Sequence, residues 1–67
     1  MTEYYVVVIH GSLEMKPISF SKGAFLSYPT SGEIEEIIRY YNEEYEPPSG
    51  MSFKVNYATV EKRYMME

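Results

Sequence analysis

The chain has 67 residues, a formal net charge of −4 and no cysteine, so it forms one small domain, residues 1–67, without disulfides. With a single His and no Cys, we expect no metal site. Because 45% of the residues are hydrophobic and 16% are aromatic, the composition is typical of a folded domain and excludes a disordered tail.

The first predicted element is a β-strand over residues 3–9. Residues 4–9 are aromatic or β-branched without interruption, which is typical of a central strand with neighbours on both sides. His10-Gly11-Ser12 is expected to end it. Both alternating faces of this strand are apolar. The face turned away from a covering helix must therefore meet a second copy, a partner, or side chains that lean in from adjacent strands.

The segment 13–28 contains a second strand whose alternation is interrupted. Ile18 and Phe20 fall on one face of a regular strand, and Phe25 falls on the other. The register must therefore change near Gly23, either by a bulge in one bent strand or by a tight turn that splits the segment in two. We favour the bulge, because Lys-Gly is a weaker hairpin signal than Asn-Gly. Pro17 lacks an amide donor and predicts a sheet edge or a strand start.

An acidic amphipathic helix is predicted to follow, between Thr30 and the sequence Pro47-Pro48-Ser49-Gly50. Thr30 and Glu33 have the spacing of a capping box at its start, and the two prolines end it. One apolar stripe repeats at helical spacing: Ile34, Ile37, Ile38, Tyr41 and Tyr45.

The carboxylates of this helix lie opposite the stripe. Residues 31–46 hold six Glu and one Arg, a net charge of −5, whereas the rest of the chain has a net charge of +1. Arg39 lies one turn from Glu35 and from Glu43, so two ion pairs are expected. The six Glu span about 20 Å, one per about 3.3 Å, close to the phosphate spacing of about 3.4 Å along a DNA strand. The pattern fits an ordinary solvated helix face or a nucleic-acid mimic.

The last predicted strand covers residues 51–64. Phe53, Val55 and Tyr57 alternate with polar residues, and the parity changes after Tyr57, which indicates a second bend. The element order β-β-α-β predicts an α+β fold with two layers. One amphipathic helix covers an antiparallel sheet of three strands, or of four if residues 13–28 split. We expect the first strand at the centre, in the order 2-1-3.

The sequence carries no catalytic, cofactor-binding or metal-binding motif. His10 and Ser12 lack the third group of a triad, and the chain contains no Asp. The glycines stand singly, so they form no phosphate-binding loop, and a chain of this size does not enclose a pocket. We therefore expect a protein that is not an enzyme and that needs no cofactor.

Four cations and two tyrosines offer a surface on which a nucleic-acid strand could stack: Lys22, Lys54, Lys62, Arg63, Tyr57 and Tyr64. The acidic net charge argues against nucleic acid as the partner. No apolar run reaches the length of a membrane span, about 18 residues, and residues 1–3 lack the basic region of a signal peptide. We therefore expect a cytoplasmic protein that does not bind membranes.

From Thr30 to Val60 the chain resembles small phage-encoded inhibitors of host enzymes. The resemblance consists of the capped acidic helix, the turn at residues 47–50 and the alternating strand of Phe53, Val55 and Tyr57. Inhibitors of this class that block host RNA polymerase have a similar three-stranded sheet with one helix. The resemblance implies a compact acidic protein that occludes a surface of a larger partner, and it carries over no functional residue.

The sequence thus predicts a protein-interaction module, an inhibitor or adaptor that binds a basic surface of a larger protein. The predicted partner-binding residues lie on the acidic side of the helix: Glu35, Glu36, Tyr40, Glu43 and Glu44. Among them, Tyr40 is an aromatic residue surrounded by carboxylates, as at the anchor of an interface. The alternatives are a structural homo-oligomer, such as a homodimer, that uses the exposed sheet face or an edge, and a nucleic-acid-binding module that uses the Tyr and Lys side chains of the sheet.

Overall fold

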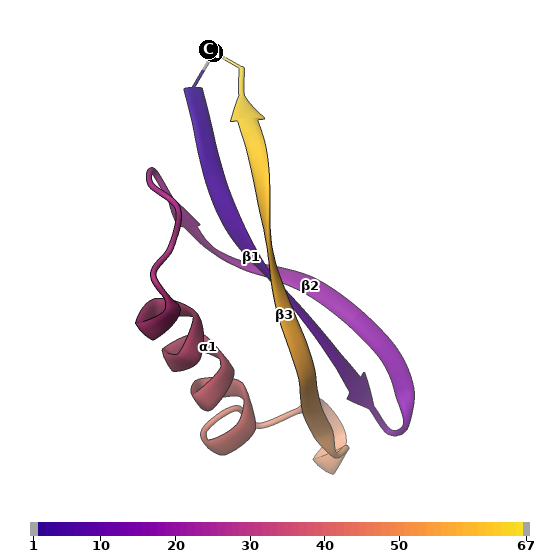
Figure 1. The fold of residues 1–67 in the computed structure, drawn as a ribbon. Helices are drawn as coiled ribbons and strands as arrows, with labels where there is room; N and C mark the ends of the chain where they lie inside the picture. The colour runs from indigo at the N-terminus through magenta and orange to yellow at the C-terminus, as the bar shows by residue number, and fades with distance from the viewer. Residues whose placement is uncertain (1, 67) are drawn as a thin grey trace.

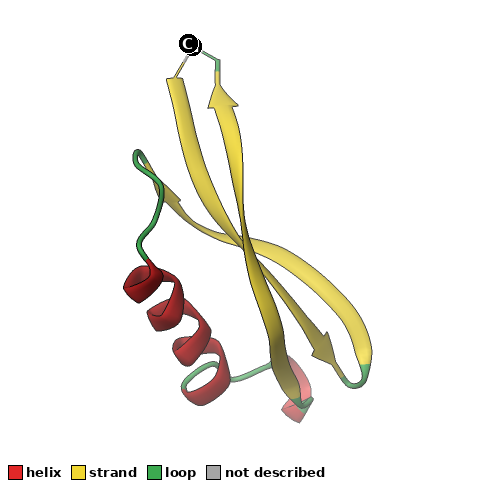
Figure 2. Cartoon of the chain, viewed as in Figure 1, coloured by secondary structure: helices red, strands yellow, loops and turns green. Residues whose placement is uncertain are grey.

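The computed structural model describes residues 2–66 and contains one helix packed on a three-stranded sheet (Figures 1 and 2). Strand β1 spans Thr2–Leu13, β2 spans Lys16–Phe25 and β3 spans Phe53–Met65. The helix α1 spans Ser31–Glu43, and a short 3₁₀ turn, η1, spans Pro48–Gly50. All strand pairs are antiparallel, in the order β2-β1-β3. The predicted α+β fold with its first strand at the centre is confirmed, and the described residues form three strands, not four.

The sheet is longer along β1 and β3 than along β2. β1 pairs with β3 from Thr2 to Leu13 but with β2 only from Tyr5 onward. The start of β1 and the end of β3 therefore extend beyond β2 as a two-stranded ribbon (Figure 1).

β1 is longer than predicted because Gly11 continues the strand. Gly11 is buried and pairs with Val55 on β3. A Cβ atom at this position would lie 2.5 Å from the carbonyl oxygen of Lys54 and 3.0 Å from the ring of Phe53. The absence of a side chain thus lets the Phe53 ring lie across β1, and the prediction that residues 10–12 end the strand is wrong.

A two-residue turn, Glu14-Met15, joins β1 to β2, and both of its residues have positive φ, 50° and 68°. Turns of this kind usually contain Asn or Gly. Here Glu14 is held by the residue that precedes β3: its amide donates to the Ser52 carbonyl, and its carboxylate accepts from the Ser52 amide, both at 3.0 Å. These two hydrogen bonds offset part of the cost of the left-handed conformation.

Two bulges account for the predicted changes of parity. The pairing of β2 with β1 shifts at Gly23, whose φ is 78°, so β2 is one bulged strand and Phe25 returns to the face of Phe20. The pairing of β3 with β1 shifts at Asn56, which is before Tyr57 and not after it. Tyr57 therefore pairs with His10 on the face opposite Val55, and the predicted alternation of Phe53, Val55 and Tyr57 on one face is wrong at Tyr57. Pro17 lies near the start of β2, an edge strand, as predicted.

α1 covers the sheet face on which Val7 and Ile9 are fully buried (Figure 1). The Val55 amide on β3 donates to Asn42 Oδ1 at 3.1 Å, which fixes the end of α1 to that strand. The predicted apolar stripe of the helix packs here. The core and the side chains around it are Val7, Ile9, Tyr41 and Val55, with Phe20, Phe25, Ile34, Ile37, Ile38, Tyr45, Phe53 and Ala58.

The start of α1 is as predicted, and its end comes earlier. The capping box is formed: the Glu33 amide donates to Thr30 Oγ1 (3.1 Å), and the Thr30 amide donates to Glu33 Oε1 (2.9 Å). At the other end, the amides of the two residues that follow Glu43 both donate to the Tyr40 carbonyl, at 2.8 and 2.9 Å. This shared acceptor closes the last turn, so residues 44–46 lie outside the helix.

Candidate partner-binding surface

The five predicted partner-binding residues are all exposed, because the apolar stripe of α1 turns the opposite side of the helix to solvent. A shallow depression of about 350 Å³ brings most of them together. This acidic depression is lined by Glu36, Arg39, Tyr40, Glu43 and Glu44. Glu35 lines an adjoining hollow with Ile38 and Asn42, and Arg39 and Glu43 line both hollows.

The carboxylates of this surface are not neutralised by ion pairs. Over residues 2–66 the ion pairs are Lys62–Glu3 at 3.8 Å and Arg63–Glu61 at 3.7 Å, both on the sheet. Neither predicted pair of Arg39 is formed, so that prediction is wrong. An exposed pair on a helix gains only a few tenths of a kcal/mol, which is comparable to the cost of ordering two long side chains. The negative charge of the surface thus remains available to a cationic partner.

The carboxylates do not form an even row. Glu33 is engaged in the capping box, and Glu46 lies beyond the end of α1. The remaining Glu35-Glu36 and Glu43-Glu44 form two pairs, about 12 Å apart at a rise of about 1.5 Å per residue. The mean spacing of one carboxylate per about 3.3 Å therefore does not describe a continuous row, and along the helix the surface has two acidic pairs with Tyr40 between them.

Tyr40 connects this surface to the core. It is 44% exposed, and its ring packs edge-on against Tyr41 at a centroid distance of 5.0 Å. Tyr41 is 8% exposed. Burial, together with the nearby phenols of Tyr40 and Tyr45, raises the pKa of the Tyr41 hydroxyl above its ordinary value of 10.0. Tyr40 is thus exposed on one side and held by an aromatic contact on the other.

The sheet face away from α1 shields its own apolar residues. Val6 and Val8 point to this face yet are only 5% and 6% exposed. The residues paired with them across the sheet are Ala24 and Glu61 for Val6, and Ser21 and Thr59 for Val8. The sequence left open whether a second copy, a partner or the adjacent strands cover these residues, and the low exposure within the single chain indicates the adjacent strands. The centre of this face therefore offers little apolar area to a second copy.

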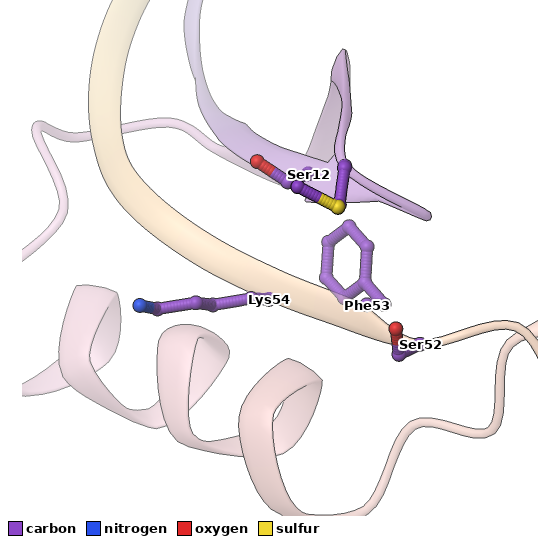
Figure 3. Close-up of a pocket in the computed structure, with 5 residues that line it drawn as sticks. Ser12, Ser52, Phe53 and Lys54 are labelled. Atoms are coloured by element: carbon purple, nitrogen blue, oxygen red, sulfur yellow. The ribbon is translucent and has the colours of Figure 1, made fainter.

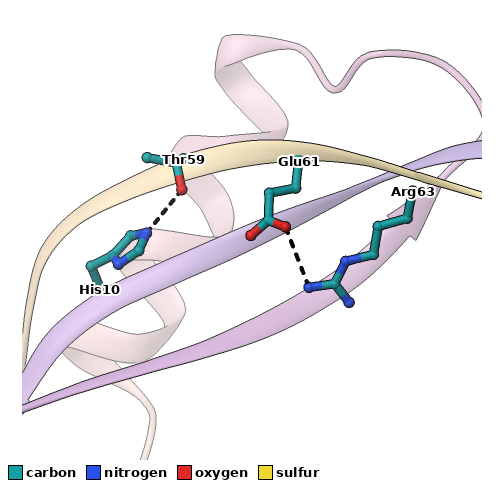
Figure 4. A network of polar contacts seen from close by, with 4 residues as sticks. All are labelled: His10, Thr59, Glu61 and Arg63. Atoms are coloured by element: carbon teal, nitrogen blue, oxygen red, sulfur yellow. Dashed lines mark hydrogen bonds and ion pairs between the residues drawn. The ribbon is translucent and has the colours of Figure 1, made fainter.

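His10 lies on the same face, inside β1 and not at its end (Figure 4). Its Nδ1 is 2.9 Å from Ser19 Oγ and its Nε2 is 2.8 Å from Thr59 Oγ1. Figure 4 shows that Glu61 contacts Arg63 and not the imidazole. The imidazole is thus held between two hydroxyls and not by a carboxylate, which differs from the arrangement of a Ser-His-Asp triad. No group of three His, Cys, Asp or Glu side chains within residues 2–66 is arranged to hold a metal.

The cations and tyrosines considered for nucleic-acid binding do not share a surface. Directly paired residues of adjacent strands point to the same face of the sheet. The strand register therefore shows on which face each of the six side chains lies. Lys54, Tyr57 and Arg63 lie on the open face, and Lys22, Lys62 and Tyr64 lie on the side of α1. A single nucleic-acid strand could not contact all six at once.

Another hollow, about 380 Å³ in volume, lies where the end of β1 meets the start of β3 (Figure 3). It is lined by Ser12, Met15, Ser52, Phe53 and Lys54. Lys54 is the one ionisable residue among them, so the hollow lacks the pair of groups that general acid–base catalysis uses.

The structure holds no helix, in the part that it describes, with the length and apolar character needed to cross a bilayer. Compared with models of protein families, with curated proteins and with solved structures, the chain gives no match.

Proposed function

We propose that this protein is a protein-interaction module, an inhibitor or adaptor that places the outer face of α1 on a basic surface of a larger protein. The observation that carries the proposal is the acidic depression, in which the carboxylates of Glu36, Glu43 and Glu44 make no ion pair. Like charges held on one helix face repel each other, and a basic partner relieves that repulsion. Such a contact accelerates association and weakens with salt.

The structure around Tyr40 supports the same proposal. An exposed aromatic ring surrounded by charged groups matches the usual arrangement of an interface, with an aromatic anchor inside a polar rim. The edge-on contact with Tyr41 limits the freedom of the ring before binding. The capping box at Thr30 and the hydrogen bond from Val55 to Asn42 fix both ends of α1. The helix backbone therefore needs little further ordering on binding, which lowers the entropic cost.

In its narrower form, the proposal is that the basic surface is one that otherwise binds nucleic acid, and that the protein is encoded by a phage. The narrower form is supported only by the fold, in which a capped acidic helix lies on a sheet of strand order β2-β1-β3. The two carboxylate pairs would then face separate groups of cations on the partner, without reproducing a continuous phosphate backbone.

A charge-reversal experiment tests the proposal. The double variant Glu36→Lys/Glu43→Lys should capture its partner from a lysate about 5- to 100-fold less well, because each exposed ion pair contributes about 0.2–1 kcal/mol and reversal adds repulsion. The matched control is Glu3→Lys/Glu61→Lys, which changes the net charge equally on the sheet and removes only exposed ion pairs. Equal capture by the wild type and both variants would rule out the acidic face of α1.

Two observations argue against the alternative of a homodimer that forms through the sheet. Val6 and Val8 are buried, so the open face of the sheet has little apolar area at its centre for a second copy to cover. The outer edge of β2 carries Lys16, Pro17 and the Gly23 bulge, all of which oppose strand pairing. Light scattering at high protein concentration separates the candidates, since a stable dimer that survives high salt would favour the homodimer.

A further inference from the structure

A second hollow lies beside the acidic depression and shares a wall with it. This apolar groove, about 340 Å³ in volume, is lined by Lys22, Glu36, Ile37, Tyr40 and Tyr41. Glu36 and Tyr40 line both hollows. A group bound in one hollow would therefore lie next to a group bound in the other.

The groove is open because α1 lies towards β3 and because β2 has no side chain at its bulge. The hydrogen bond from Val55 to Asn42 anchors the helix on the β3 side. A Cβ atom on Gly23 would lie 3.9 Å from Ile37 Cδ1 and 2.9 Å from the Phe25 ring. A larger residue at Gly23 would thus intrude between β2 and α1, where the groove lies.

The floor of the groove is held in place by ring contacts. Tyr41 packs edge-on against Phe20 at 5.1 Å and against Tyr40 at 5.0 Å, and its own side chain is nearly buried. A floor fixed in this way loses little freedom when a ligand binds. The groove thus presents a preformed apolar surface at the border of a charged one.

We propose that the groove accepts one large apolar side chain from a Lys- or Arg-rich segment of the partner, whose cations lie in the acidic depression. The inference rests on the proposed function and narrows the partner to a basic segment with an apolar anchor. Charge complementarity selects this occupant: three carboxylates in the depression outnumber its one cation, Arg39. Lys22, on the opposite wall of the groove, disfavours a cation there and confines the basic residues to the helix side.

A second copy of this chain fits the same surface less well. The chain carries a net charge of −4, so two copies repel each other. Its adjacent cations Lys62 and Arg63 are already paired with Glu3 and Glu61. A basic segment of another protein meets neither obstacle.

Two synthetic peptides test the inference on the full chain labelled with ¹⁵N. Both consist of Lys and Ser, one with a central Leu and the other with Ser in its place. In NMR titrations, both should shift the amides of Glu36, Glu43 and Glu44. The Leu peptide should also shift those of Lys22 and Ile37, and it should bind about fivefold to tenfold more tightly, as expected for partial burial of one Leu.

Variants of two exposed tyrosines complete the test. Tyr40→Ala removes the shared wall and should abolish the advantage of the Leu peptide, whereas Tyr57→Ala, on the open face, should keep it. If both peptides bind equally and shift only amides of the acidic depression, the groove does not bind an apolar side chain and the inference is wrong, but the proposed function is unaffected. If neither peptide shifts α1, the proposed function fails as well. If the Leu peptide binds equally to Glu36→Lys/Glu43→Lys, the basic character assigned to the partner segment is wrong.

Discussion

Substitution of Gly11 by Ala tests the close approach of β1 and β3 on which the core depends. The added Cβ would lie 2.5 Å from the Lys54 carbonyl oxygen and 3.0 Å from the Phe53 ring. Ordinary contacts of a Cβ atom begin near 3.4 Å, so the carbonyl would have to retreat by about 0.9 Å. Because a carbonyl belongs to the backbone, the strand itself must move.

The expected loss of stability follows from two opposing terms. Overpacking of a filled site costs about 1–3 kcal/mol. The replacement of Gly by Ala restricts the unfolded chain and returns about 0.4–1 kcal/mol. The net loss should be about 1–2 kcal/mol, which lowers the melting temperature of a domain of this size by about 5–15 °C. That loss is a considerable part of a total stability of about 3–10 kcal/mol.

Two other glycines provide matched controls. At Gly32, in the first turn of α1, the nearest atom to an added Cβ is Thr30 Oγ1 at 3.9 Å, so Gly32→Ala should stabilise the helix by about 0.5–1 kcal/mol. At Gly50 nothing lies within 4 Å, but φ is 68°, so Gly50→Ala should lose about 1–2 kcal/mol through backbone conformation alone.

Urea unfolding followed by far-UV circular dichroism measures all three variants. Phe53→Leu removes part of the obstruction and should recover some of the loss in Gly11→Ala but none of the loss in Gly50→Ala. If Gly11→Ala is as stable as the wild type, the contact between Gly11 and the Lys54–Phe53 segment is wrong, and with it the register of β3 on β1.

Three further outcomes are expected. Thr30→Ala removes a helix cap and should cost about 1 kcal/mol in thermal unfolding, whereas Thr30→Ser should cost little. Glu14→Ala leaves the Ser52 amide without its carboxylate acceptor and frees a turn with two positive φ values; a loss of about 1–2 kcal/mol in urea unfolding is expected. The raised pKa of Tyr41 means that the unfolded state loses this proton first. Its contribution to stability should be complete below about pH 10 and should disappear as the pH rises further, and Tyr41→Phe should make the urea midpoint less dependent on alkaline pH.

The features that the sequence predicted depend on near neighbours along the chain. The helix start follows from Thr30 and Glu33, which are three residues apart and bond each other. The bulge at Gly23 follows from the parity of the apolar residues on either side of it. The order of the strands follows from the apolar character of both faces of β1, which requires neighbours on both sides.

The features that the sequence did not predict depend on distant residues. Gly11 continues β1 because the Phe53 ring lies over it. The Glu14-Met15 turn forms without Asn or Gly because Ser52 holds Glu14. No local pattern contains this information, since each contact joins the first third of the sequence to β3 or to the residue just before it.

The candidate site was predicted only where it depends on the local helical pattern. The exposure of the five partner-binding residues follows from the helical period, which separates them from the apolar stripe. The absence of ion pairs at Arg39 and the groove beside Tyr40 could not be predicted from that period. The groove depends on the position of α1 over the sheet and on the approach of Lys22 from β2.

The position of β1 between β2 and β3 has a consequence for synthesis of the protein. A ribosome releases β1 and β2 well before β3, so for an interval the most apolar strand has one unpaired edge. Pairings between distant segments form slowly, and an open edge can recruit other chains. Since β3 closes that edge along its full length, shortening the chain within β3 should leave an aggregating nascent species and not a trimmed native domain.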